Sequence, residues 1–331
     1  MHKRLLPLLA LLATPLTATA LMAEVPHVAT DIPPVHSLVS QVMGDLGTPA
    51  LIVRPGASPH DYALRPSEAA ALERADLVVW IGHGLTPWLE TPLQRLAATA
   101  QVIELMDTPG TRTLPYRETA VFSPDDHAED HADDHDDHAD EHMDEHADDD
   151  DHADHDHAHD HSGIDPHGWL DPENGRFWLS LIAQALSEAD PENAATYAAN
   201  AEVARARLDA TIAQIDITLA PVSTKPFVVF HDAFQYFEKR FHMTAAGAIS
   251  LSDAAAPSPA RIAAIRQAVQ DHGVTCVFSE PQFNPGLVAT VFDGTGAHTA
   301  VIDPLGTGLP LGPDLYTDLL TGLARTMADC L

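Results

Sequence analysis

Three histidines of this 331-residue sequence stand where apolar runs end or where ordered sequence resumes. His60 lies in a Gly/Pro-rich segment, His231 directly follows the apolar run Phe227–Phe230, and His167 lies in a proline-stiffened turn. Neutral imidazole is a borderline-soft ligand that suits Zn²⁺, Cu²⁺ and Ni²⁺, whereas magnesium and manganese sites favour carboxylates. Three imidazoles with a carboxylate or a water would complete four-coordinate zinc, so these residues predict a transition-metal site.

A fourth ligand could come from Asp303, which follows Val301-Ile302 and precedes a proline. Asp-Pro after a strand is also a common turn, so water remains the alternative fourth ligand. His36 and His83 are interpreted as structural or solvated residues. Four carboxylates are near enough in sequence to accept hydrogen bonds from the far ring nitrogens of the three histidines: Asp61, Asp165, Asp171 and Asp232.

A different kind of metal-binding segment lies between Asp125 and His161. It has 19 acidic residues, 11 histidines and no Lys or Arg, and so carries −19 of the formal net charge of −32. The absence of apolar periodicity predicts a disordered loop. Its flexible imidazoles could bind several ions weakly and gather them for the tight site, although an inert solvated segment is the alternative. The candidate weak ligands are His127, His131, His135, His138, His142, His146, His152, His155, His157, His159 and His161.

The amino terminus has the pattern of a signal peptide. Met1 to Arg4 are basic, and residues 5–22 are apolar but too short and proline-interrupted to span a bilayer comfortably. Small residues place cleavage after Ala20 or Ala23. No cysteine is present here to carry a lipid anchor, and no later run predicts a membrane helix. We therefore predict an exported, soluble, periplasmic protein.

Cys276 and Cys330 are the two cysteines of the sequence. In an oxidising compartment an even pair favours one structural disulfide. A thiolate metal site is the weaker alternative, because zinc sites built on cysteine usually have close C-x₂-C spacing and these residues are 54 positions apart.

Strand-like runs alternate with helical patterns on both sides of the acidic segment. The predicted strands are 27–30, 50–53, 77–81, 101–105, 227–230, 245–250, 274–278 and 299–302. The predicted helices are 35–43, 66–75, 88–98, 173–189, 192–219, 234–241, 259–272, 286–292 and 314–328. This alternation predicts an α/β protein with two βα lobes, each with a parallel sheet, joined by a long helix. Because ligands bind beyond the carboxyl ends of parallel strands, we expect the metal in the cleft between the lobes.

Several sequence blocks in this order resemble the zinc-specific solute-binding proteins of bacterial ABC importers, the ZnuA type within the cluster A-I metal-binding receptors. The likeness covers essentially the whole mature chain. The blocks are residues 54–62, 77–82, the acidic histidine-rich insertion, 165–172, 230–237, 279–283 and 303–306.

The resemblance implies two lobes joined by a rigid helix, with zinc held between them and delivered to an inner-membrane ABC permease. His60, His167 and His231 fall on the family's three histidine ligands, and manganese relatives tend to carry Glu at the third position. Cys276 and Cys330 fall on a disulfide of the zinc branch. Some members have Glu just before the first ligand, where this chain has Pro59, which favours Asp303 or water as the fourth ligand.

The predicted boundaries are a signal peptide at 1–23, a first lobe at 24–171 containing the loop 125–161, a linking helix at 172–189 and a second lobe at 190–331. We expect a monomer that binds one Zn²⁺ tightly and further ions weakly in the loop. A periplasmic zinc chaperone is a second expected partner, after the permease.

Other classes fit the sequence less well. The strongly acidic chain lacks the basic surface that nucleic-acid binding requires. A zinc hydrolase would share the three-histidine pattern, but the sequence has no H-E-x-x-H helix and no evident general base. A receptor for manganese or another transition metal and a metal buffer or adhesin that works without a permease remain alternatives.

Overall fold

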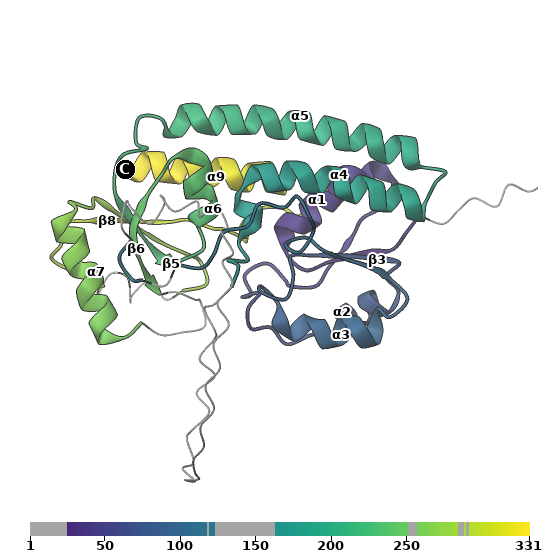
Figure 1. Cartoon of the computed structure of the whole chain (residues 1–331), viewed down its shortest axis with the longest axis horizontal. Helices are drawn as coiled ribbons and strands as arrows, with labels where there is room; N and C mark the ends of the chain where they lie inside the picture. Colours follow the sequence, from purple (N-terminus) through teal and green to yellow (C-terminus); the bar gives the residue numbers. More distant parts are fainter. Residues whose placement is uncertain (1–24, 118, 123–162, 251–256, 284–287, 289–290) are drawn as a thin grey trace, which may run out of the picture.

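The computed structural model describes residues 25–117, 119–122, 163–250, 257–283, 288 and 291–331. These residues form two four-stranded sheets in which all strand pairs are parallel, with helices around them. The α/β fold class predicted from the alternation of patterns is therefore confirmed. Figure 1 shows the two sheets side by side beneath a layer of long helices.

The first sheet has the strand order β2-β1-β3-β4. Its strands are β1 (Val28–Thr30), β2 (Ala50–Leu51), β3 (Leu77–Trp80) and β4 (Gln101–Glu104). Its helices are α1 (Pro33–Met43), α2 (Pro66–Glu73) and α3 (Glu90–Leu96), with 3₁₀ turns at Gly44–Leu46 and Pro87–Leu89. Proline occupies the first turn of α1 and α2, where no backbone N–H is needed.

The second sheet repeats this order as β6-β5-β7-β8. Its strands are β5 (Phe227–His231), β6 (Ala245–Ser250), β7 (Cys276–Ser279) and β8 (His298–Val301). Its helices are α6 (Gln235–Phe241), α7 (Pro259–Asp271) and α9 (Leu315–Cys330). Cys276 in β7 forms a disulfide with Cys330 at the end of α9, with Cα atoms 5.9 Å apart. The predicted disulfide is therefore present.

Two further helices, α4 (Pro172–Ala189) and α5 (Ala194–Leu219), follow a 3₁₀ turn at Gly168–Leu170. Helix α5 packs against α4, against α1 of the first half and against α9 of the second half. Figure 1 shows it running along the top of both halves. One continuous apolar core includes residues from α1, α4, α5, α9 and both sheets, so the two halves share packing that resists their separation.

Each sheet also buries its outer face separately. In β3, Val78 and Trp80 pack under α2 and α3, while Leu77 and Val79 enter the shared core. In β5, Val228 and Phe230 pack near α7, while Phe227 and Val229 enter the shared core. Strands buried on both faces explain why their sequences are continuously apolar.

Some predictions fall on residues that the structure does not describe. The signal peptide at 1–23 and the histidine-rich segment at 125–161 lie outside the described residues, as does most of the helix predicted at 286–292. Within the described residues, no helix combines the length and apolar character needed to cross a bilayer.

Candidate metal centre

The structure brings His60, His167 and His231 together from three distant parts of the chain. Each ring offers one nitrogen to a group whose atoms all lie within 4.8 Å of one another. The ring centroids are 5.5 Å apart for His60 and His167, 6.0 Å for His60 and His231, and 4.9 Å for His167 and His231. Imidazole nitrogens bond zinc at about 2.0–2.1 Å, so these three residues are candidates to share one ion.

His60 is held by the loop that follows β2. The indole N–H of Trp88 donates to the carbonyl of Pro59 at 2.7 Å. Buried Glu68 accepts from Arg54 before the histidine and from the Tyr62 hydroxyl after it, each at 2.9 Å. Burial alone would raise the pKa of Glu68, but hydrogen bonds from the Arg65 backbone, Arg54 and Tyr62 lower it below its ordinary value. The charged carboxylate therefore ties both sides of the loop to α2.

His167 is buried and paired with Asp165. Its Nδ1 lies 2.6 Å from Asp165 Oδ1, which also accepts from the His167 backbone N–H at 3.0 Å. Burial raises the pKa of Asp165 to about 7. The Tyr236 hydroxyl donates to the Asp165 carbonyl at 2.8 Å and accepts from the Leu114 N–H at 2.9 Å. A carboxylate on Nδ1 is the arrangement that leaves Nε2 to a metal.

His231, the last residue of β5, faces a carboxylate that sequence proximity did not single out. Its Nδ1 lies 3.3 Å from both carboxylate oxygens of Glu280, which is buried just past the end of β7. Glu280 is 49 positions away, yet β7 neighbours β5 in the sheet. The rule that chemistry gathers at adjacent strand ends could have found Glu280 inside the Ser279–Phe283 block.

The other carboxylates expected to orient the rings have different partners. Asp232, the residue after β5, forms ion pairs with buried Arg117. Asp171 caps α4 by accepting from the Glu173 N–H, and Asp61 is exposed. Of the four predicted acceptors, Asp165 is the one that contacts a clustered histidine.

Asp303 is not part of the histidine group. Its carboxylate accepts from the backbone N–H groups of Leu305 and Gly306, at 3.0 and 2.9 Å, and from Thr307. Both of its oxygens thus accept hydrogen bonds within this local turn, and Asp303 as the fourth ligand stays a prediction. His36 and His83 also lie outside the group: His36 is buried and bonds the Pro49 carbonyl at 3.1 Å, and His83 pairs with Glu90 at 3.0 Å.

The cavity beside the three rings is very small. Its volume is about 10 Å³, roughly the space of one water-sized particle. The lining residues are Pro59, His60, His167, Trp169, His231, Gln282, Pro304 and Leu305. Such a space suits an ion better than an organic substrate.

A family model for ZnuA, the periplasmic component A of zinc-uptake complexes, matches residues 28–330. The chain belongs to this family. High-affinity zinc uptake system proteins ZnuA from Brucella abortus (strain 2308) and Paracoccus denitrificans (strain Pd 1222) are 50% and 49% identical to it. The alignments cover 95% of this chain and 94% of the Brucella protein, and 93% of each chain for Paracoccus. The resemblance to the ZnuA type is thus confirmed.

Solved structures of the ZnuA fold are also similar to this chain. A crystal structure of ZnuA superposes with a TM-score of 0.70 at 22% identity, covering 92% of this chain and 98% of the other. A mutant of the laminin-binding adhesin Lmb from Streptococcus agalactiae gives 0.71 at 23% identity, covering 92% and 99%. At these identities the superpositions speak for the fold alone.

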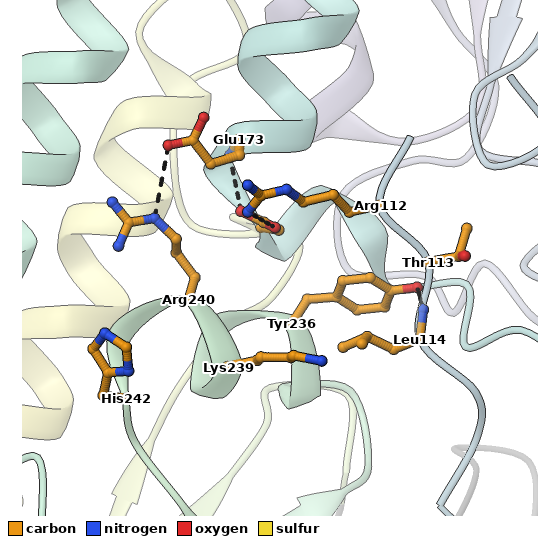
Figure 2. Close-up of a pocket in the computed structure, with 9 residues that line it drawn as sticks. Arg112, Thr113, Leu114, Glu173, Tyr236, Lys239, Arg240 and His242 are labelled. Carbon is orange, nitrogen blue, oxygen red and sulfur yellow. Dashed lines mark hydrogen bonds and ion pairs between the residues drawn. The ribbon is translucent and has the colours of Figure 1, made fainter. Parts of the chain in front are cut away.

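A larger cavity of this ZnuA-family chain, about 620 Å³, lies near the start of α4 and the end of α6. Figure 2 shows Arg112, Lys239 and Arg240 around it, with Arg240 pairing with Glu173. The two carboxylates of the lining, Asp171 and Glu173, already pair with Arg112 and Arg240, which disfavours a metal cation. The small histidine cavity, and not this large one, is the candidate metal centre.

Proposed function

We propose that this protein is the periplasmic receptor of a zinc importer, which binds one Zn²⁺ tightly through His60, His167 and His231 and delivers it to an ABC permease. The observation that carries the proposal is the meeting of three buried or half-buried imidazoles at one ion-sized cavity. Family membership over residues 28–330 supports the uptake role.

The donor set supports zinc over manganese. All three members of the group are imidazoles, and no carboxylate among the described residues joins them. Manganese and magnesium prefer carboxylate oxygens, whereas nitrogen ligands suit zinc. A manganese receptor is the runner-up and would require a carboxylate to enter the group.

Several features support a carrier over a zinc hydrolase. The cavity beside the rings is small, about 10 Å³, which disfavours a bulky scissile substrate at the ion. The nearby carboxylates Asp165 and Glu280 both face ring nitrogens, where they orient ligands and are not positioned as free general bases. Capture and release of the ion is the chemistry this arrangement can perform.

The proposed function also includes roles for the two segments that the structure does not describe and for a partner protein. The signal peptide 1–23 directs export, with cleavage after Ala20 or Ala23. The eleven histidines between Asp125 and His161 bind further Zn²⁺ weakly and pass ions to the tight site, and a periplasmic zinc chaperone supplies that segment. The receptor acts as a monomer with lobes at 24–171 and 190–331, linked by the helix 172–189.

Metal titration of the mature chain tests the proposal. Zinc affinity would be measured by competition with a chromophoric chelator for the wild type, His60→Ala, His167→Ala and His231→Ala, with His83→Ala as the matched control on the surface. Each cluster variant should lose about 1,000-fold or more, because even outer partners of a ligand contribute 10- to 100-fold, while the control stays at wild type. Wild-type affinity in two of the three cluster variants would overturn the proposal.

A second measurement separates the tight site from the loop. Deleting residues 125–161 should preserve one-site tight binding and lower the number of zinc ions bound. Loss of tight binding in the deletion would show that this division of labour is wrong. Restoration of zinc-limited growth in a strain lacking its own receptor tests delivery to the permease.

A further inference from the structure

Three histidines leave one position of tetrahedral zinc to be filled. Among the other residues that line the cavity, Pro59, Pro304 and Leu305 have no polar side-chain atom. The Trp169 indole has only a donor, which bonds the Pro304 carbonyl at 2.8 Å. Apart from the three histidines, Gln282 is therefore the side chain among these described lining residues that can accept a hydrogen bond beside the ion.

The orientation of the Gln282 amide follows from its neighbour. Its nitrogen donates to Glu280 Oε2 at 2.8 Å. Because a Glu280 oxygen accepts this bond, the amide nitrogen faces Glu280 and the amide oxygen faces another direction. Glu280 in turn contacts Nδ1 of His231, so one chain of contacts fixes both the ring and the amide.

Two other acceptors near the cavity are already engaged. The Asp303 carboxylate accepts from the backbone of its own turn, and the Pro59 carbonyl accepts from Trp88. A zinc-bound water is a strong donor because the ion draws electron density from it. Placed in this cavity, such a water has the amide oxygen of Gln282 as its available side-chain acceptor.

We propose that Gln282 is a positioning residue for the fourth zinc position, where its amide oxygen accepts a hydrogen bond from a water bound to the ion. The inference rests on the proposed zinc-receptor function. A neutral amide accepts a hydrogen bond but cannot take the proton, so Gln282 would orient the water without acting as a general base. A replaceable fourth ligand suits an ion that must later be released.

The test compares two substitutions at this position. Gln282→Leu keeps the approximate volume and removes the acceptor, and should weaken zinc binding by about 10- to 100-fold, the value of a hydrogen bond to a charged group. Gln282→Glu restores an acceptor but places a carboxylate against Glu280. Recovery of affinity in Gln282→Glu relative to Gln282→Leu supports the water contact. If Gln282 acted only as a donor to Glu280, Gln282→Glu would bind as weakly as Gln282→Leu or more weakly, which would overturn the proposal.

Spectra of the Co²⁺-loaded protein give an independent readout. The visible bands of Co²⁺ respond to the fourth ligand, so they should change in Gln282→Leu, while three nitrogen neighbours persist in X-ray absorption. Wild-type affinity and an unchanged spectrum in Gln282→Leu would overturn the inference. Loss of a direct metal neighbour in that variant would also overturn it, by making Gln282 itself a ligand.

Gln267→Leu is the matched control, because Gln267 donates its amide to the Asp271 carboxylate at the same 2.8 Å but lies exposed on α7. It should bind zinc as the wild type does. The histidine variants separate the proposed function from the role of Gln282. If they bind zinc tightly, the proposed function fails; if they lose zinc while Gln282→Leu behaves as wild type, only the inference about Gln282 fails.

Discussion

The two sheets have the same strand order, yet the ends of their corresponding strands are used differently. After β1, the first strand of the first sheet, Asp31 is fully buried and accepts from the backbone N–H groups of Ile32 and Ile81 at 2.8 and 2.7 Å. At the end of β5, the corresponding strand of the second sheet, His231 faces the side chain of Glu280. Backbone groups satisfy the side chain at the first strand end, whereas a carboxylate contacts the imidazole at the second.

The comparison extends to the charges. Asp31 is satisfied by N–H groups and burial raises its pKa to about 7. Asp232, which follows His231, is paired with Arg117, a residue from the segment that leaves the first half of the chain. Arg117 also pairs with Glu238 and lies 3.7 Å from the centre of the Phe122 ring. The ends of β1 and β5 thus occupy equivalent positions in their sheets. The side chains that pack around each end decide whether it has a structural role or is a candidate for metal binding.

The largest expected effect concerns Arg117. Arg117→Met leaves Asp232 and Glu238 buried without their cation, and should lower the free energy of unfolding by about 3–5 kcal/mol, as measured by urea denaturation of the zinc-free protein. Arg112→Met, on the same segment but with an exposed side chain, should cost no more than about 1 kcal/mol. Equal losses of unfolding free energy in the two variants would show that the buried cluster of Arg117, Asp232 and Glu238 does not stabilise the region beside His231.

The next expected effect is a pH dependence of folding stability that comes from Asp31, at the end of β1. The pKa of Asp31 is raised in the folded protein from 3.8 to about 7, so the folded state keeps this proton over a range in which the unfolded chain has released it. The stability that comes from Asp31 is therefore complete at low pH and falls as pH rises. Between pH 5 and 8 the loss should be about 2–3 kcal/mol.

Asp31→Asn removes this titration and should flatten the dependence of stability on pH, measured by urea unfolding without metal. Asp165 changes stability in the same direction, because burial raises its pKa to about 7 as well, so the difference between wild type and Asp31→Asn isolates Asp31. An unchanged slope in the variant would show that Asp31 is not the group responsible.

A smaller effect concerns the partner of His231. Glu280→Gln should weaken zinc binding by about 10- to 100-fold, because the ring loses the carboxylate that orients it and raises its basicity. Glu90→Gln removes the equivalent contact from the exposed pair His83–Glu90 in the first half, and its zinc affinity should equal that of wild type. Zinc affinity equal to that of wild type in Glu280→Gln would show that Glu280 does not orient His231 for the metal.

The smallest effect is expected at Asp303. Asp303→Ala breaks a turn whose carboxylate bonds backbone groups, so zinc affinity measured by chelator competition should change by no more than about threefold, while stability falls by roughly 1 kcal/mol. A loss of 100-fold or more would instead make Asp303 the fourth ligand.

The sequence by itself predicted most of the described elements and the three histidines that the structure brings together. Runs such as Leu77–Trp80 are apolar because both faces of each sheet are buried. This local pattern predicts a strand from the sequence alone. Predicted ends shifted by one or two residues, as at β7, which begins at Cys276 and not at Val274, because strand ends depend on the neighbouring strand. The positions of His60, His167 and His231 after strands or in a stiff turn were sufficient to select them.

Only the tertiary structure decided which groups face those histidines. Glu280 lies close to His231 because β7 is hydrogen-bonded to β5, and no spacing along the chain encodes that adjacency. Asp232 and Asp303 are near ligands in sequence or at strand ends, yet one turns to Arg117 and the other to its own backbone. The physical reason is that a side chain beyond a strand end bonds the partners that packing brings near it, and only the folded chain specifies those partners.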